Sequence, residues 1–79
     1  MYIIEYNTAV NKYIVSTINY DENNKVNNVN YFYFTDGHLF CKDFENKEEC
    51  YPVVNFIQNY TINHKSDIDI NSIKIKKVK

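Results

Sequence analysis

Residues 29–44, VNYFYFTDGHLFCKDF, decide the fold that the sequence predicts. Two aromatic-rich runs in this stretch flank Asp36-Gly37. Asp-Gly is a strong hairpin signal, because a type I′ turn needs positive φ at both of its central positions. A two-residue loop would place Tyr31 opposite Lys42 across the ribbon. We therefore expect an aromatic β-hairpin here.

The two faces of this hairpin have different chemical characters, because side chains alternate along a strand. One face is apolar throughout and suits a core. The other is amphipathic, since tyrosine combines a large apolar ring with a polar tip, and it suits a covering element or a partner molecule. The apolar face is expected to carry Phe32, Phe34, Leu39 and Cys41, and the amphipathic face Tyr31, Tyr33, Phe40, Lys42 and Phe44.

Outside the hairpin, apolar periodicity predicts three further strands and one helix. Residues 2–6 and 12–20 alternate and are expected to form a first hairpin, followed by a polar loop over residues 21–28. Residues 67–70 and 73–76 also alternate, and the parity slips at Asn71-Ser72, as a β-bulge would require. The helical period covers residues 46–60, with Cys50, Val53, Val54, Ile57 and Tyr60 on one stripe and Pro52 in the first turn.

These elements predict a single α+β domain over residues 1–79. Its mainly antiparallel sheet should have four or five strands, with one helix packed on one face, in the order ββββαβ. Val53, Val54 and Ile57 would then cover the apolar face of the aromatic hairpin. A chain of this length leaves little room for both a core and a deep cleft.

Catalytic, metal and cofactor sites find little support in the sequence. A single glycine excludes a glycine-rich phosphate loop. The combination of His38, Cys41, Cys50 and His64 resembles a zinc set only in residue type, because an odd spacing in one strand turns the first two to opposite faces. Cys50 with His64 as a nucleophilic pair, and the carboxylates of Asp67 and Asp69, are chance combinations at this size. We expect no enzyme, metal or cofactor.

The predicted location is the cytoplasm. Residues 1–10 lack the basic start and continuous apolar run of a signal peptide, and no stretch approaches the ~20 apolar residues of a membrane span. Both cysteines are then expected as reduced thiols, with a Cys41–Cys50 disulfide as the alternative.

Nucleic acid is one class of partner to consider. Tyr31, Tyr33 and Phe40 could stack on bases, and a C-terminal lysine cluster could contact phosphate. The formal net charge of −1 and the absence of arginine weigh against this function. The cluster comprises Lys74, Lys76, Lys77 and Lys79.

Protein binding is the function that the sequence favours. Surplus tyrosine on one sheet face supplies contact area, and a neighbouring acidic stretch would steer a basic partner. An oligomeric structural protein, in its simplest form a homodimer, is a further alternative. The residues expected to bind a partner are Tyr31, Tyr33, Phe40, Lys42, Asp43, Glu45, Glu48 and Glu49.

In size, composition and lack of catalytic residues the chain resembles small phage- or mobile-element-encoded proteins that inhibit a host protein by occluding a surface, anti-CRISPR-like proteins among them. Its richness in Asn, Ile, Lys and Tyr matches AT-rich codons, which fits a low-GC bacterium, its phage or a large DNA virus. The resemblance implies a host protein as partner, in the cytoplasm of the host cell.

Overall fold

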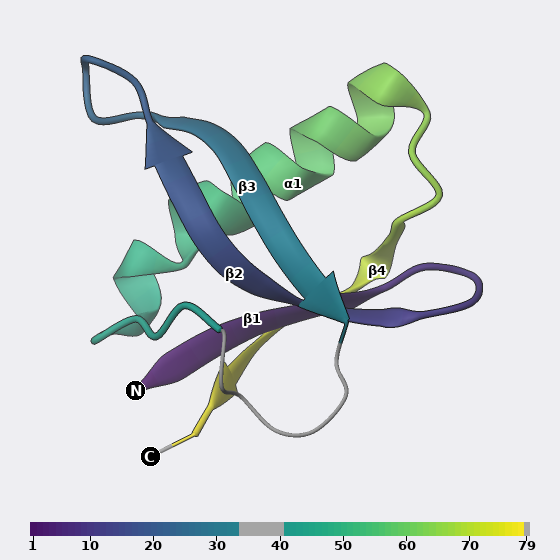
Figure 1. The fold of residues 1–79 in the computed structure, drawn as a ribbon, viewed down its shortest axis with the longest axis horizontal. Helices are drawn as coiled ribbons and strands as arrows, with labels where there is room; N and C mark the ends of the chain where they lie inside the picture. Colours follow the sequence, from purple (N-terminus) through teal and green to yellow (C-terminus); the bar gives the residue numbers. More distant parts are fainter. Residues whose placement is uncertain (34–40, 79) are drawn as a thin grey trace.

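The computed structural model describes residues 1–33 and 41–78, which form a four-stranded antiparallel sheet with one α-helix across one of its faces (Figure 1). The strand order is β3-β2-β1-β4. The elements are β1 (Tyr2–Asn7), β2 (Lys12–Tyr20), β3 (Val26–Tyr33), the 3₁₀-helix η1 (Lys47–Glu49), α1 (Tyr51–His64) and β4 (Asp69–Lys77).

The predicted α+β class, the antiparallel sheet and the single packed helix are confirmed. β1 and β2 form the first hairpin as expected. The predicted order ββββαβ holds when Phe44, which forms an isolated bridge with Tyr2, is counted as the fourth β position before the helix. That position is a single bridge rather than a strand.

The aromatic hairpin is corrected in its described part. Tyr31 pairs with Val15 of β2 and not with Lys42. The Lys42 N–H donates to the Val15 carbonyl at 2.9 Å, and Phe44 exchanges two backbone hydrogen bonds of 2.8 Å with Tyr2. The physical reason is that β1 and β2 pair with each other only near their shared turn, so Tyr2 and Val15 offer backbone groups that need partners. The predicted turn and the other hairpin residues, 34–40, lie outside the described residues.

Phe44 is a second correction, because it is buried in the core and not on an outer face. It belongs to a cluster with the helix and with the helix-facing side of the sheet. The helix contributes Val53 and Ile57, and Thr61 continues the same buried stripe. The sheet contributes Ile4, Tyr6, Tyr13 and Val15. The side chains of the predicted helix partners Phe32, Phe34 and Leu39 lie outside the described part.

Helix α1 begins where proline allows, with Pro52 in its first turn, as expected. It continues to His64, four residues beyond the predicted end at Tyr60. Thr61 explains the difference, because its side chain is buried and its hydroxyl donates to the Ile57 carbonyl at 2.8 Å. Lys65 then ends the helix in the left-handed conformation, at φ 51°.

The irregularity predicted at Asn71-Ser72 is present in β4. The pairing register between β1 and β4 shifts between Lys74 and Asp69. The Ser72 hydroxyl accepts a hydrogen bond from the Asn7 N–H at 2.7 Å and donates to the Asp69 carbonyl at 2.6 Å. The side chain thus satisfies backbone groups that the regular ladder leaves unpaired.

Candidate functional site

The residues predicted to bind a partner fall at two places beside α1. Tyr31 lines a pocket between the sheet and the second half of the helix. Lys42, Asp43, Glu45 and Glu49 line a broader groove that includes residues from the start of the helix. Glu48 is exposed and lines neither, and the Tyr33 side chain and Phe40 lie outside the described part.

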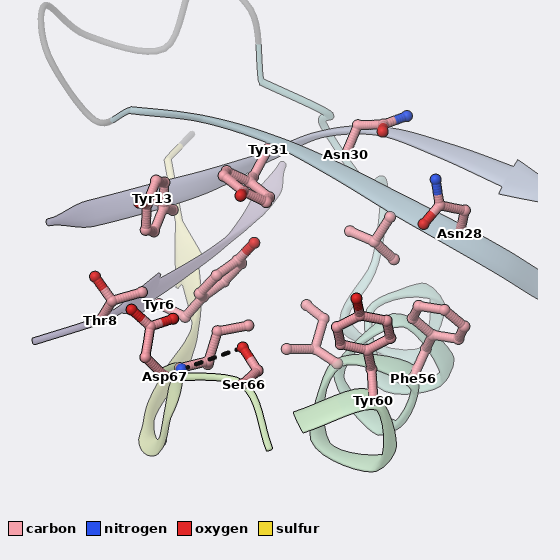
Figure 2. Close-up of a pocket in the computed structure, with 13 residues that line it drawn as sticks. Tyr6, Thr8, Tyr13, Asn28, Asn30, Tyr31, Phe56, Tyr60, Ser66 and Asp67 are labelled. Atoms are coloured by element: carbon pink, nitrogen blue, oxygen red, sulfur yellow. Dashed lines mark hydrogen bonds between the residues drawn. The ribbon is translucent and has the colours of Figure 1, made fainter. Parts of the chain in front are cut away.

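The first of these places, here called the tyrosine pocket, has a volume of about 340 Å³. Figure 2 shows aromatic rings on two sides of it. Tyr6, Tyr13 and Tyr31 come from β1, β2 and β3, and Phe56 and Tyr60 come from α1. A pocket of this size is at the small end of the range for ligand sites.

The three sheet tyrosines contact one another, and the ring of Tyr31 is steeply inclined to the other two. Tyr31 lies edge-on to Tyr13, with ring centroids 4.5 Å apart, and edge-on to Tyr6 at 6.1 Å. Tyr6 and Tyr13 face each other across the β1–β2 register, at 5.8 Å. Tyr31 is 52% exposed while Tyr6 is only 3% exposed, so the cluster extends from the core to the surface.

Tyr6 is the deepest of these rings, and its hydroxyl points into the pocket (Figure 2). Burial, and then the neighbouring hydroxyls of Tyr31 and Tyr13, raise the pKa of Tyr6 far above its ordinary value. The pocket therefore holds a neutral phenol at neutral pH.

The raised pKa of Tyr6 predicts a loss of stability in alkali. The folded state keeps the Tyr6 proton longer than the unfolded state, so the stabilisation is complete below pH ~10 and declines as the pH rises toward the folded-state pKa. One such group contributes a slope of about 1.4 kcal/mol per pH unit above pH ~10. Urea denaturation of the native chain and Tyr6→Phe between pH 8 and pH 11 should show a shallower decline for the variant.

Tyr20→Phe is the matched control for this experiment, because Tyr20 is 50% exposed. Its pH profile should follow that of the native chain. Identical profiles for all three proteins would contradict the proposed state of Tyr6.

The rim of the tyrosine pocket is polar. Thr8 and Ser66 line it, and the Ser66 hydroxyl accepts a hydrogen bond from the Ile68 N–H at 3.4 Å. Asp67 is exposed, and it is the one charged residue among the described residues that line the pocket. The pocket thus combines aromatic walls with a single carboxylate at its mouth.

The second place, here called the acidic groove, has a volume of about 900 Å³ and is wide open. Asp43, Glu45 and Glu49 line it, and Lys25 and Lys42 oppose their charge. The Glu49 carboxylate accepts a hydrogen bond from the Glu45 N–H at 2.9 Å, which fixes one acid near the start of the helix. Apolar side chains that line the groove include Tyr20, Val26 and Phe56.

The alternative chemical sites do not assemble among the described residues. No group of three His, Cys, Asp or Glu side chains there could hold a metal ion. Cys50 precedes the first residue of α1 and His64 is its last, so a 14-residue helix of ~21 Å separates the proposed nucleophile and base. The Asp69 carboxylate accepts the Asn71 N–H at 3.0 Å, which is a local turn contact.

The cysteines are also separate, and no disulfide joins Cys41 to Cys50. Burial, and then the Asp43 carboxylate, raise the pKa of the Cys41 thiol. Burial, and then Glu49, raise the pKa of the Cys50 thiol. Both shifts disfavour the reactive thiolate, as expected for structural cysteines.

Sequence reasoning named Tyr31 but expected it on the sheet face away from the helix, and its pairing with the core residue Val15 corrects this by placing it on the helix face. Four of the aromatic residues that surround it were missed. Tyr6 and Tyr13 had been placed on strands without being paired, although a hairpin turn at residues 8–11 would have brought them together. Phe56 and Tyr60 come to the pocket through the packing of α1 on the sheet, which no local pattern specifies.

Comparison of the chain with family models, curated proteins and solved structures gives no match. No helix in residues 1–33 and 41–78 is long and apolar enough to cross a membrane.

Proposed function

We propose that this chain is a non-enzymatic protein-binding module whose binding surface runs along α1 and the neighbouring strands. The observation that carries the proposal is that Phe56 lines both the tyrosine pocket and the acidic groove. The two concavities therefore meet at one residue of the helix and offer a partner a continuous surface.

The composition of this surface supports protein recognition. Exposed tyrosines such as Tyr31, Tyr60 and Tyr20 supply apolar contact area with polar tips, the combination enriched in interface hot spots. The three carboxylates of the acidic groove exceed its two lysines, so a basic partner surface is favoured and would associate faster.

The kind of partner that we propose is a host protein, inhibited by occlusion of its surface, in the manner of anti-CRISPR-like proteins. The support is the small size of the chain, its AT-biased composition and the two binding concavities formed by the described residues. In this proposal the protein acts in the cytoplasm of the host cell.

Nucleic-acid binding is weakened by the placement of its two elements. Tyr31 pairs with the core residue Val15 and lies on the helix side of the sheet. Lys74 and Lys76 pair with Glu5 and Ile3, and they alternate with Ile75, which packs against the core, so they lie on the opposite face. Aromatic rings and lysines on opposite faces cannot stack on bases and bind phosphates of the same strand together.

Reversing one charge in the acidic groove tests the proposal. Asp43→Lys should weaken capture of the partner from a low-salt bacterial host lysate about tenfold, because it replaces an attraction with a repulsion. Capture is measured on immobilised full chain, followed by titration calorimetry with the protein identified.

Asp69→Lys makes the same charge change at an exposed position of β4 that lines neither concavity, and it should leave capture intact. Equal capture by both variants would contradict the acidic groove as an interface. Sedimentation of the purified chain separates a homodimer from a monomer, and a gel shift with single-stranded RNA at low salt tests the nucleic-acid alternative.

A further inference from the structure

We propose that the tyrosine pocket binds an organic cation, namely the guanidinium or ammonium head of an arginine or lysine side chain. As an anchor for a partner protein this inference rests on the proposed function. The cation chemistry itself rests on the pocket alone.

The arrangement of rings suits a cation. The electron-rich face of an aromatic ring attracts a positive charge within ~6 Å of its centroid. Tyr31 is inclined at 75° to Tyr6 and at 68° to Tyr13, so the sheet side of the pocket has rings in crossed orientations. Phe56 and Tyr60 form the helix side of the pocket. Tyr60 is stacked between Phe56, at 6.3 Å, and His64, at 4.2 Å, so it offers the pocket its hydroxyl and ring edge rather than an open face.

The charge of the pocket selects a cation over an anion. Among the described residues that line the pocket, Asp67 at the rim is the one charged residue, and none is a lysine. A carboxylate at the rim repels phosphates and carboxylates. It would pair with a guanidinium or ammonium group that enters past it.

The hydroxyl of Tyr6 adds a polar contact in the pocket, because it points into the cavity (Figure 2). Because burial keeps the phenol protonated and neutral, its oxygen can accept a hydrogen bond from an N–H group. A guanidinium or ammonium head offers that donor.

The volume of about 340 Å³ admits the end of a side chain or a small amine. Arginine fits the site in two ways, because its planar guanidinium stacks on aromatic faces and its N–H groups reach Asp67 and Tyr6 together. Lysine would make the same contacts with a more strongly hydrated charge, so arginine should bind better.

The test is a titration of the ¹⁵N-labelled full chain followed by amide chemical shifts. Methylguanidinium should shift the amides of Tyr6, Tyr31, Tyr60 and Ile68 in a saturable manner. N-methylurea, which has nearly the same shape without the charge, should bind at least fivefold more weakly. Equal binding of the two compounds, or shifts spread over the whole sheet, would overturn the inference.

Matched variants locate the site. Tyr60→Ala should weaken methylguanidinium binding at least fivefold, while Tyr51→Ala should not, although both tyrosines are on α1 and are 45% and 49% exposed. Asp67→Asn changes the rim charge with almost no change in shape and should weaken binding about threefold. If Tyr60→Ala does not fold, the test rests on Asp67→Asn. Unchanged methylguanidinium binding by Asp67→Asn would refute the proposed charge pairing.

Two further arms identify the source of the cation and separate this inference from the proposed function. Tighter binding of a capped Gly-Arg-Gly peptide than of tetramethylammonium supports a side chain, and the reverse order would overturn that assignment in favour of a free quaternary amine. If Tyr60→Ala loses methylguanidinium binding but still captures the partner, the anchor role is refuted while the proposed function stands. If no partner is captured at all, the proposed function fails and the titration still decides the cation site.

Discussion

Ile57→Ala is expected to remove about 2–5 kcal/mol of the free energy of unfolding, which is comparable to the roughly 3–5 kcal/mol that a core of this size supplies. Ile57 is 3% exposed and packs in the centre of the core cluster with Val53, Phe44 and the sheet residues Ile4 and Val15. Truncation would leave a cavity that a short helix, fixed at both ends, cannot close. Most of the variant should therefore be unfolded without stabilising solutes.

Ile62→Ala is the matched control, because it removes the same atoms from the same helix at a position that is 65% exposed. Its free energy of unfolding should change by less than about 0.5 kcal/mol. The measurement is urea denaturation followed by circular dichroism, with trimethylamine N-oxide added to recover folded Ile57→Ala. Equal stability of the two variants would show that the helix is not packed as described.

Glu5→Lys is expected to have the second large effect, a loss of about 3–5 kcal/mol. Glu5 is 3% exposed on the sheet face away from the helix. Its Oε1 lies 3.5 Å from the Lys12 Nζ, its Oε2 lies 3.9 Å from the Lys76 Nζ, and no described group gives Oε2 a hydrogen bond. A lysine there would bury an unpaired cation between two others.

Two variants separate charge from packing at this position. Glu22→Lys makes the same charge change in an exposed turn and should alter stability by less than about 0.5 kcal/mol. Glu5→Leu should keep the protein folded, because Lys12 and Lys76 have half-exposed side chains that water can solvate once the carboxylate is gone. If Glu5→Lys has the same free energy of unfolding as Glu22→Lys, the buried position of the Glu5 side chain is refuted.

Local patterns predicted most of the fold. Alternation along residues 12–20 matches β2 at both ends, and the parity slip at Asn71-Ser72 matches the irregular pairing of β4. These predictions succeeded because each depends only on which side chains of one short segment face the core, and that pattern is visible in the local sequence. The end of α1 was missed because Thr61, polar by type, is buried and bonds its hydroxyl within the helix.

The pairing of residues 41–44 could not be predicted from the hairpin pattern. A turn motif predicts pairing only between residues that are near each other in the sequence. Residues 41–44 instead bond to backbone groups that β1 and β2 leave unpaired where they diverge. Long-range pairing thus determined where Phe44 lies, and Phe44 became a core residue.

The candidate site was predicted only in part for the same reason. Tyr31 was identified from its strand, yet the pocket depends on Phe56 and Tyr60, which reach it through the angle at which α1 crosses the sheet. The acidic residues 43–49 were expected beside Tyr31. The structure instead places Asp43, Glu45 and Glu49 in a separate groove that meets the tyrosine pocket only at Phe56.

The pairing of β1 with β4 also has a consequence for synthesis on the ribosome. Ile3 pairs with Lys76 and Ile4 with Ile75, so β1 leaves the ribosomal exit tunnel long before β4, the strand that fills its second edge. The emerging chain should stay incompletely folded until translation has passed residue 77, and closing so long a loop is a slow step. A chaperone that shields exposed strand edges would have its main opportunity in that interval.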